Sequence, residues 1–189
     1  MPLPPLESDA AERQTLDEIL EWYRGIVDAL LDQHNAVRHA MGTGGGVKPR
    51  FLGWTDAELD QYYDDQRQEL DRLTALNLVA STEASIRVDY ARRVAGKLTD
   101  PLSLYYIAWH NTLSEAKQAR PDFEGDGILE RLKQANVLDN NRVGRYRECL
   151  RSRHWVGHGR YWAKRGDVDR LIPDIVHTRC AELLRALPP

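Results

Sequence analysis

The fold class is decided by residues 55–97, which read TDAELDQYYDDQRQELDRLTALNLVASTEASIRVDYARRVAGK. Thr55 and Glu58 stand three residues apart and form a capping box, which predicts that a helix begins there. Apolar and small residues then recur at alternate spacings of four and three, the period of one helix face. The predicted inward stripe is Leu59, Tyr63, Gln66, Leu70, Leu73, Asn77, Ala80, Ala84, Arg87 and Ala91. The stretch therefore predicts one long helix that ends near Lys97.

The rest of the chain has the same period. Apolar residues between Leu16 and Met41 predict a second long helix, with Ser8 as its candidate N-cap and Gly42 as its stop. Four shorter helices are also predicted. The first follows Pro101 and has Leu104, Tyr105, Ile107 and Ala108 on its inward face, and the second ends near Asn136. The third is capped by Asp139 or Asn140, and the fourth covers Val168–Leu187 with Pro173 in its first turn. No segment alternates with the period of a strand. We therefore predict an all-α protein, an elongated bundle of about four to six helices.

Length and composition limit the class of protein. The 189 residues fit one domain, and we expect residues 1–189 to form a single unit. With 42% hydrophobic and 29% charged residues, the composition is that of an ordinary globular protein, not a disordered one. No apolar run is as long as a membrane span, and the start of the chain lacks a signal-peptide pattern. Cys149 and Cys180 have no ligand or redox spacing, so we expect a cytoplasmic protein with two buried thiols.

The charge is unevenly distributed along the chain. Residues 1–100 contain 11 basic and 18 acidic side chains, whereas residues 101–189 contain 15 basic and 11 acidic ones. Nine basic residues fall within 142–170: Arg142, Arg145, Arg147, Arg151, Arg153, Arg160, Lys164, Arg165 and Arg170. This concentration of positive charge is where a polyanion is expected to bind. The alternative is that the arginines only solvate helix faces.

Residues 153–159, RHWVGHG, lie inside this basic segment and contain the residue types of a reactive site. An arginine that stays protonated and an imidazole that exchanges its proton near neutral pH form a minimal pair for cleaving a phosphodiester. Other Arg-to-His pairs in the chain have similar spacing. Context distinguishes this one, because a polar residue follows Arg153, a glycine follows His158 and basic residues flank both.

The stretch resembles the R-polar-x3-H signature of HEPN domains, the helical ribonuclease modules of toxin–antitoxin systems, abortive-infection proteins and RNA-guided CRISPR effectors. Residues 77–87, NLVASTEASIR, are similar to the long central helix of such domains, where an interior glutamate and arginine follow small and apolar residues. The resemblance covers the helical layout of most of the chain, but only residues 153–159 are specific.

The resemblance implies a metal-independent endoribonuclease that needs no cofactor. A ribose 2′-hydroxyl would attack the adjacent phosphate and leave a 2′,3′-cyclic phosphate and a 5′-hydroxyl. His158 would transfer the proton, Arg153 would hold the scissile phosphate and stabilise its charge, and His154 would position the phosphate or His158. The resemblance also implies a toxin or phage-defence role, restrained by an antitoxin or a nucleotidyltransferase partner.

Other residues are predicted to support this site. Glu83 and Arg87 stand four residues apart, as a surface ion pair or as a support for the active site. Tyr161 can stack on an unpaired base or pack in the core. The predicted RNA-binding residues are Arg147, Arg151, Arg160, Tyr161 and Lys164.

Helix geometry limits how the reactive pair can act. Residues five apart on an ideal helix point about 140° away from each other, so Arg153 and His158 cannot share a face. Either the backbone bends at Gly157 and Gly159, or a second copy of the chain completes the site. The resemblance favours the second reading, a homodimer with a composite RNA cleft.

Three other readings stay open. The first is a metal site, because His154 and His158 have the i,i+4 spacing of two zinc ligands. Trp155 occupies the place of the zincin glutamate and no third ligand is evident, so a metal-free site is the main expectation. A non-catalytic helical module that binds RNA, a nucleotide or a partner protein would have the same basic face. Finally, Arg153 can pair with an acid such as Glu148 while His158 caps a helix end.

Overall fold

The computed structural model describes residues 14–158 and 172–189, and within these ranges every regular element is helical. The elements are α1 (Leu16–Thr43), the 3-10 turn η1 (Pro49–Phe51), α2 (Asp56–Ala95), α3 (Pro101–His110), α4 (Glu115–Ala119), α5 (Ile128–Gln134), α6 (Asn140–Gly157) and α7 (Pro173–Arg185). The predicted all-α class is confirmed for the described residues. The seven α-helices in these ranges exceed the expected four to six because the short α4 has no clear periodic pattern of its own.

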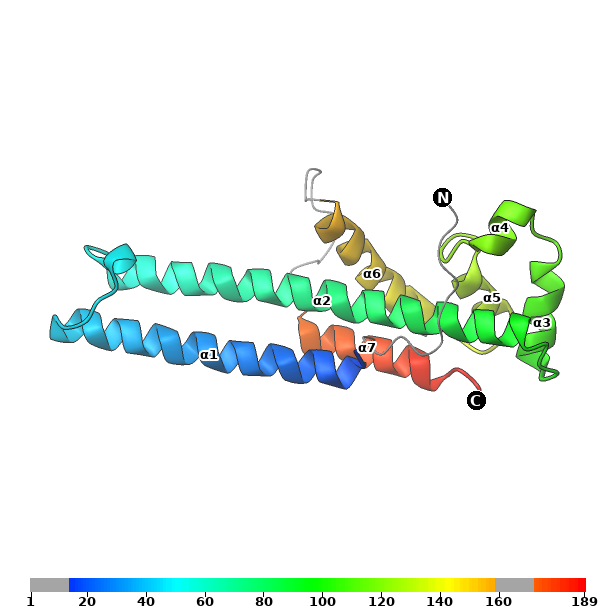
Figure 1. Cartoon of the computed structure of the whole chain (residues 1–189), viewed down its shortest axis with the longest axis horizontal. Helices are drawn as coiled ribbons and strands as arrows, with labels where there is room; N and C mark the ends of the chain where they lie inside the picture. The colour runs from blue at the N-terminus through cyan, green and yellow to red at the C-terminus, as the bar shows by residue number, and fades with distance from the viewer. Residues whose placement is uncertain (1–13, 159–171) are drawn as a thin grey trace.

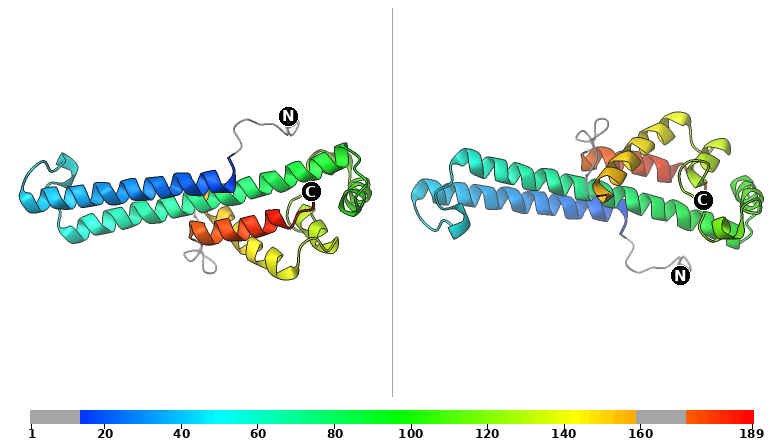
Figure 2. Two further views of the ribbon diagram at one scale, coloured as in Figure 1. Left: turned by 90° about the horizontal axis from the view of Figure 1, so that it is seen from below. Right: turned by 90° about the horizontal axis from the view of Figure 1, so that it is seen from above.

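The two long helices form the frame of the molecule. α1 and α2 run antiparallel as an extended hairpin, and η1 lies in the connection at its tip (Figure 1). The 40 residues of α2 correspond to about 60 Å at 1.5 Å per residue, so α2 extends well beyond the start of α1. α6 and α7 pack against the second half of α2 from one side of the hairpin (Figure 2). The opposite side of the hairpin is not covered by either helix.

Two separate hydrophobic clusters stabilise this arrangement. The larger lies where α2 meets α6 and α7, and its members include Leu78, Val79, Ile86, Tyr146, Cys149, Leu150, Val176, Cys180 and Leu183. The smaller lies at the hairpin tip and contains Val37, Phe51, Leu59 and Tyr63. Both thiols are buried and free, as predicted, and burial raises the pKa of Cys180 to about 12.

A polar layer lies along the hairpin between the two clusters. The hydroxyl of Tyr23 on α1 donates to Oδ1 of Asp71 on α2 at 2.7 Å and accepts from Nε of Arg67 at 3.3 Å. Loss of solvent raises the pKa of Tyr23 to about 12, and the Asp71 carboxylate adds to this effect. These hydrogen bonds fix the register of α1 against α2.

Helix caps explain where the elements begin. Thr55 caps α2 in a capping box with Glu58, as predicted from the sequence. Thr15 and Glu18 form the same motif at the start of α1, so the N-cap is Thr15, and the candidate Ser8 lies outside the described residues. Asp139 caps α6, as one of the two sequence alternatives proposed.

The ends of two other helices differ from the prediction. α1 continues to Thr43 and ends at Gly44, which adopts a left-handed conformation with φ of 70°, rather than stopping at Gly42. α7 begins at Pro173, whose missing N–H is tolerated at the first helical position, and Ile172 before it is extended; the predicted start, Val168, lies outside the described residues.

Arg93 is the largest fully buried side chain and carries a charge. Its Nε lies 2.8 Å from Oδ2 of Asp89, and its Nη1 lies 3.1 Å from Oδ1 of Asp100, the N-cap of α3. Nη2 donates to the carbonyl oxygen of Pro188. One guanidinium therefore joins α2, the start of α3 and the residues that follow α7, and its donors are satisfied as burial requires.

The predicted inward stripe of α2 is correct only in its first part. Leu59 and Tyr63 are buried, but Leu73 is 49% exposed and Asn77 is also exposed. Further along, the buried positions are Thr74, Ala75, Leu78, Val79, Thr82, Ile86, Tyr90 and Arg93. The reason is that α6 and α7 cover the other face of α2, so the buried face shifts round the helix after the hairpin.

The predicted inward face of α3 also needs correction. Leu104 is 54% exposed, while Leu102, Ser103 and Tyr106 are buried against the larger cluster. The Asp100 cap and the buried Arg93 fix the rotation of this helix, since Ser103 contacts both. In the described part of the chain, no helix is long and apolar enough to cross a membrane.

Candidate functional site

The candidate site lies at the C-terminal end of α6, where the sequence stretch 153–159 begins. The helix continues through Gly157, and His158 is its C-cap residue, with its backbone N–H donating to the His154 carbonyl at 3.0 Å. The expectation that His158 ends a helix therefore agrees with the structure. The backbone stays helical up to this point, so no bend occurs between Arg153 and Gly157.

One stripe of α6 carries two of the five predicted RNA-binding residues and two of the three predicted catalytic residues. Arg147, Arg151 and His154 follow one another at spacings of four and three, and His158 comes four residues later. The rings of His154 and His158 have centroids 6.1 Å apart and are tilted by 39°. Two cationic side chains and two imidazoles thus line the same side of the helix.

Arg153 lies on a different face of α6, about 100° round the helix from His154. Its Nη1 lies 3.1 Å from Oε2 of Glu83 on α2. The other carboxylate oxygen of Glu83 accepts from Nε of Arg87 at 2.9 Å. One carboxylate, with 14% of its side chain exposed, therefore lies between two guanidinium groups and leaves an excess positive charge.

The loop before α5 closes the site from the other side. Arg87 donates to the Pro121 carbonyl at 2.8 Å and stacks with its Cζ 5.3 Å from the centroid of Phe123. Nε2 of His154 lies 2.8 Å from Oε1 of Glu124. The loop is thus linked to both α2 and α6. Glu124 was not predicted, because a lone acid in a Pro/Gly/Asp-rich loop gives no periodic signal.

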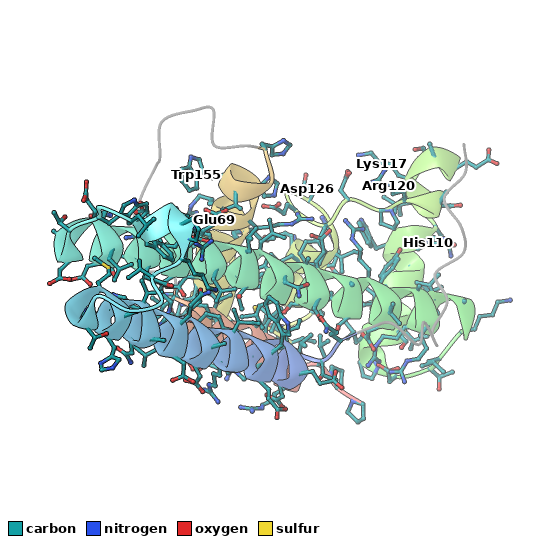
Figure 3. All side chains as sticks on the ribbon, turned by 60° about the vertical axis from the view of Figure 1, so that its left-hand side comes forward. Glu69, His110, Lys117, Arg120, Asp126 and Trp155 are labelled. Carbon is teal, nitrogen blue, oxygen red and sulfur yellow. The ribbon has the colours of Figure 1, made fainter. Side chains whose placement is uncertain are left out.

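Figure 3 shows the surroundings of this end of α6. It labels Trp155 on α6 and Glu69 on α2, and it labels Lys117 and Arg120 in the α4 region further along α2. Asp126 lies between these two groups, on the loop that leads into α5. The labelled residues thus include charges of both signs.

The five predicted RNA-binding residues differ in their contacts. Nη2 of Arg147 lies 3.0 Å from Oε2 of Glu130 on α5, and hydrogen bonds from Lys133 and Arg147 lower the pKa of Glu130. Arg151 is exposed and contacts no acidic side chain among the described residues. Arg160, Tyr161 and Lys164 lie outside the described residues.

The structure brings the predicted supporting pair to the predicted reactive arginine. Glu83 and Arg87 are 66 or more residues from Arg153 in sequence, yet the three side chains form one chain of contacts. Arg153 does not pair with Glu148, which instead lies 2.9 Å from Nη1 of Arg179 on α7. The acid partner anticipated for Arg153 thus exists, but it comes from α2.

The alternative of a metal site was compared with the positions of the possible ligands. Within residues 14–158 and 172–189, no group of three or more His, Cys, Asp or Glu side chains has an arrangement suited to a metal ion. His34 and His177, which lie on otherwise apolar faces, contact Asp60 and Asp17, both at 2.8 Å. These two histidines are thus satisfied by single carboxylates.

Comparison of the chain with protein-family models, curated proteins and solved structures gives no match. The resemblance of residues 153–159 to the HEPN signature therefore stays a prediction from the sequence.

Proposed function

We propose that this protein is a metal-independent endoribonuclease of the HEPN type, with its site at the C-terminal end of α6. The observation that carries the proposal is the pairing of a positioned arginine with a row of imidazoles. Arg153 is held through Glu83, and His154 and His158 stand on the adjacent face of the same helix. Arg147 and Arg151 extend this face toward the start of α6, where they would contact backbone phosphates.

The chemistry follows from the groups present. Neutral His158 accepts the proton of a ribose 2′-hydroxyl while the 2′-oxygen forms a bond to the neighbouring phosphorus. The bond from phosphorus to the 5′-oxygen breaks, and an imidazolium returns a proton to that oxygen. The products are a 2′,3′-cyclic phosphate and a 5′-hydroxyl, with no net gain or loss of protons. Arg153 stabilises the additional negative charge on the phosphoryl oxygens.

Glu83 is proposed to orient Arg153 without neutralising the site. A carboxylate shared between two guanidinium groups fixes both of them and leaves one positive charge uncompensated. The Arg153 side chain is 34% exposed, so part of its guanidinium stays accessible to a phosphate. His154, held by Glu124, is assigned to positioning the phosphate or His158.

Arg153 and His158 do not share a face of α6, which supports a site made from two copies of the chain. In this proposal Arg153 and His158 from both subunits face one RNA strand across a homodimer. The corresponding cellular role is that of a cytoplasmic toxin or phage-defence effector, restrained by an antitoxin or a nucleotidyltransferase partner.

A second candidate function is binding of RNA without cleavage. It is favoured by the existing contacts of Arg153 with Glu83 and of His154 with Glu124, which already engage two of the three reactive groups. In that case the α6 stripe would only hold a nucleotide or an RNA strand.

The decisive experiment is to incubate the purified protein with total RNA in the presence of chelator and to map the cut ends. The parental protein is expected to leave cyclic phosphate and 5′-hydroxyl ends. His158→Ala should reduce cleavage by at least about 100-fold, as loss of a general acid–base does, while RNA affinity changes little. His39→Ala, which removes an exposed histidine of α1, is the matched control. Binding without cleavage by the parental protein would support the second function.

A further inference from the structure

The side of the α1/α2 hairpin that faces away from α7 is apolar and exposed. On α1, Tyr23 points to α2, and Arg24 points to α7, where its Nη2 lies 2.7 Å from Asp174. Trp22 precedes Tyr23 and is rotated by about 100° in the direction opposite to Arg24. Trp22 is 51% exposed, and Ile26, one turn further on, is 37% exposed. Both therefore project from the side without α7.

The same side of α2 carries the stripe that the sequence predicted as inward. Thr82 is buried beside Cys180 of α7, and Leu73 and Ala84 lie about 180° and 160° round the helix from Thr82. The positions along this stripe from its middle part are Gln66, Leu70, Leu73, Asn77, Ala80 and Ala84. None of these six residues carries a charge, although charged residues are frequent elsewhere on α2. We call this set, with Trp22 and Ile26, the bare face.

We propose that the bare face is the contact between two copies of this chain, with their α2 helices antiparallel about a two-fold axis near Asn77. A heptad-spaced, uncharged stripe flanked by charges is the pattern of a helix that packs against another helix. Among the helices of the described residues, none packs against this stripe (Figure 2). Two-fold symmetry requires the face to be complementary to itself.

The sizes of the side chains meet this requirement. About Asn77, Leu70 falls opposite Ala84 of the other copy, and Leu73 falls opposite Ala80 and Ser81. Large side chains from the first half thus meet small ones from the second half, which allows close packing. Trp22 lies level with Leu70 and Leu73 of its own chain, because the neighbouring Tyr23 is bound to Asp71. The Trp22 ring therefore also meets the small residues of the other copy. The two Asn77 amides can hydrogen bond to each other at the axis.

The charges select the antiparallel orientation. Residues 56–72 of α2 contain seven acidic and two basic side chains, whereas residues 73–95 contain two acidic and three basic ones. An antiparallel pair sets the acidic half of each helix against the half of the other that lacks excess acid, whereas a parallel pair sets the two acidic halves together. Asp65 and Arg87 in particular come to the same edge of the contact from opposite copies.

The axis has a consequence for the candidate site. α6 meets α2 beside the stripe, through Arg153 at Glu83 and through Gly157, where an added Cβ would lie 4.0 Å from Leu76. The two-fold therefore brings the C-terminal ends of both α6 helices to one edge of the dimer. Joining them into one RNA site rests on the proposed function, but the contact itself does not.

Sedimentation velocity or light scattering over a range of protein concentrations tests the contact. The parental chain is expected to be a dimer, and Leu73→Glu should raise the dissociation constant by about 100-fold or more, because each substitution counts twice by symmetry. Leu104→Glu, at a leucine of α3 that is 54% exposed, is the matched control and should change it by less than about 3-fold. A parental chain that stays monomeric at high concentration overturns the proposal, as does a dimer that Leu73→Glu leaves intact.

Cysteine cross-linking tests the orientation independently of RNA cleavage. Cys149 and Cys180 are buried and should not react. A mixture of the Leu70→Cys and Ala84→Cys variants is expected to form a disulfide-linked heterodimer under mild oxidation, whereas neither variant should cross-link alone. Cross-linking of each variant with itself would show a parallel pair and overturn the antiparallel arrangement. If the parental chain forms this dimer but does not cleave RNA, the result counts against the proposed function and not against the contact.

Discussion

Arg153 on α6 and Glu83 on α2 form an ion pair whose nearest atoms, Nη1 and Oε2, are 3.1 Å apart. Because Arg87 binds the other oxygen of the same carboxylate, the pair is part of a three-residue network. The network lies at the junction of the two helices that the candidate site depends on. The network connects the stability of the fold to the position of Arg153, the arginine proposed to act on RNA.

Replacing Glu83 with glutamine is expected to lower the free energy of unfolding by about 1.5–3 kcal/mol, since both guanidinium groups lose a charged acceptor. Under the proposed function the same change should reduce RNA cleavage, because Arg153 is no longer held, while RNA affinity is kept or increased. Urea unfolding and single-turnover cleavage measure the two effects. Glu148→Gln, at the half-exposed partner of Arg179, is the control and should cost less than about 1 kcal/mol.

Substitution of Arg151 is expected to weaken RNA binding without changing the stability of the fold. It is exposed and has no acidic partner among the described residues, so Arg151→Ala should leave the free energy of unfolding within about 0.5 kcal/mol. If Arg151 contacts one phosphate, the slope of log affinity against log salt should become shallower by about 0.7. Lys48→Ala at the hairpin tip should leave the slope as it is. An unchanged slope in Arg151→Ala would place the RNA elsewhere.

Arg93 and Arg92 offer a comparison between neighbouring arginines that bind the same acid. Arg93 is fully buried, whereas the Arg92 side chain is 56% exposed, and both contact Asp89. Arg93→Met should cost about 3–5 kcal/mol, because it leaves Asp89 partly buried without its main counter-charge. Arg92→Met should cost less than about 1 kcal/mol. Equal losses in urea unfolding would contradict the importance assigned to burial.

The cap of α3 should make stability depend on acid pH. Hydrogen bonds from Ser103, with the charge of Arg93, lower the pKa of Asp100 in the folded chain. The unfolded chain therefore binds more protons near its ordinary pKa of about 4, and this contribution to stability is present above that pH and lost as pH falls below it. Asp100→Asn and Ser103→Ala should both flatten the rise in unfolding free energy between pH 3 and pH 5. A rise as steep as that of the parental chain would argue against the Asp100 cap as its source.

The helical class was predictable because it depends on local signals. The Thr55–Glu58 capping box, the Asp139 cap and the position of Pro173 each act within one turn of a helix, so the sequence around them suffices. The same rule would have found Thr15 and Glu18 at the start of α1. Ser8 has Ala11 three residues later and so lacks the carboxylate of a capping box, whereas Thr15 has Glu18 at that position.

The rotation of α2 was not predictable in the same way. The stripe through Leu73 and Asn77 has perfect helical spacing, but a second face through Leu78, Val79 and Thr82 competes with it. Only the positions of α6 and α7 decide which face is buried within one chain. A sequence contains both faces, and long-range contacts choose between them.

The candidate site was partly predictable. The grouping of Glu83, Arg87 and Arg153 was anticipated as a support, because an arginine on an apolar helix face suggests a specific partner. Its link to Glu124 through His154 was not, since the loop position depends on how α5 packs on α6. Contacts between distant segments are set by packing, and spacing in the sequence does not encode them.

The two hydrophobic clusters of the hairpin, separated by the layer of Tyr23, Asp71 and Arg67, imply that the molecule opens in two cooperative units. Amide hydrogens around Val37 and Leu59, which depend on the smaller cluster, should exchange with deuterium through local fraying of the tip. Those of Leu78 and Leu150 should exchange only when the whole chain unfolds. The hairpin tip can thus unfold locally, by thermal motion or on binding another molecule, while the end of the molecule that carries α6 stays folded.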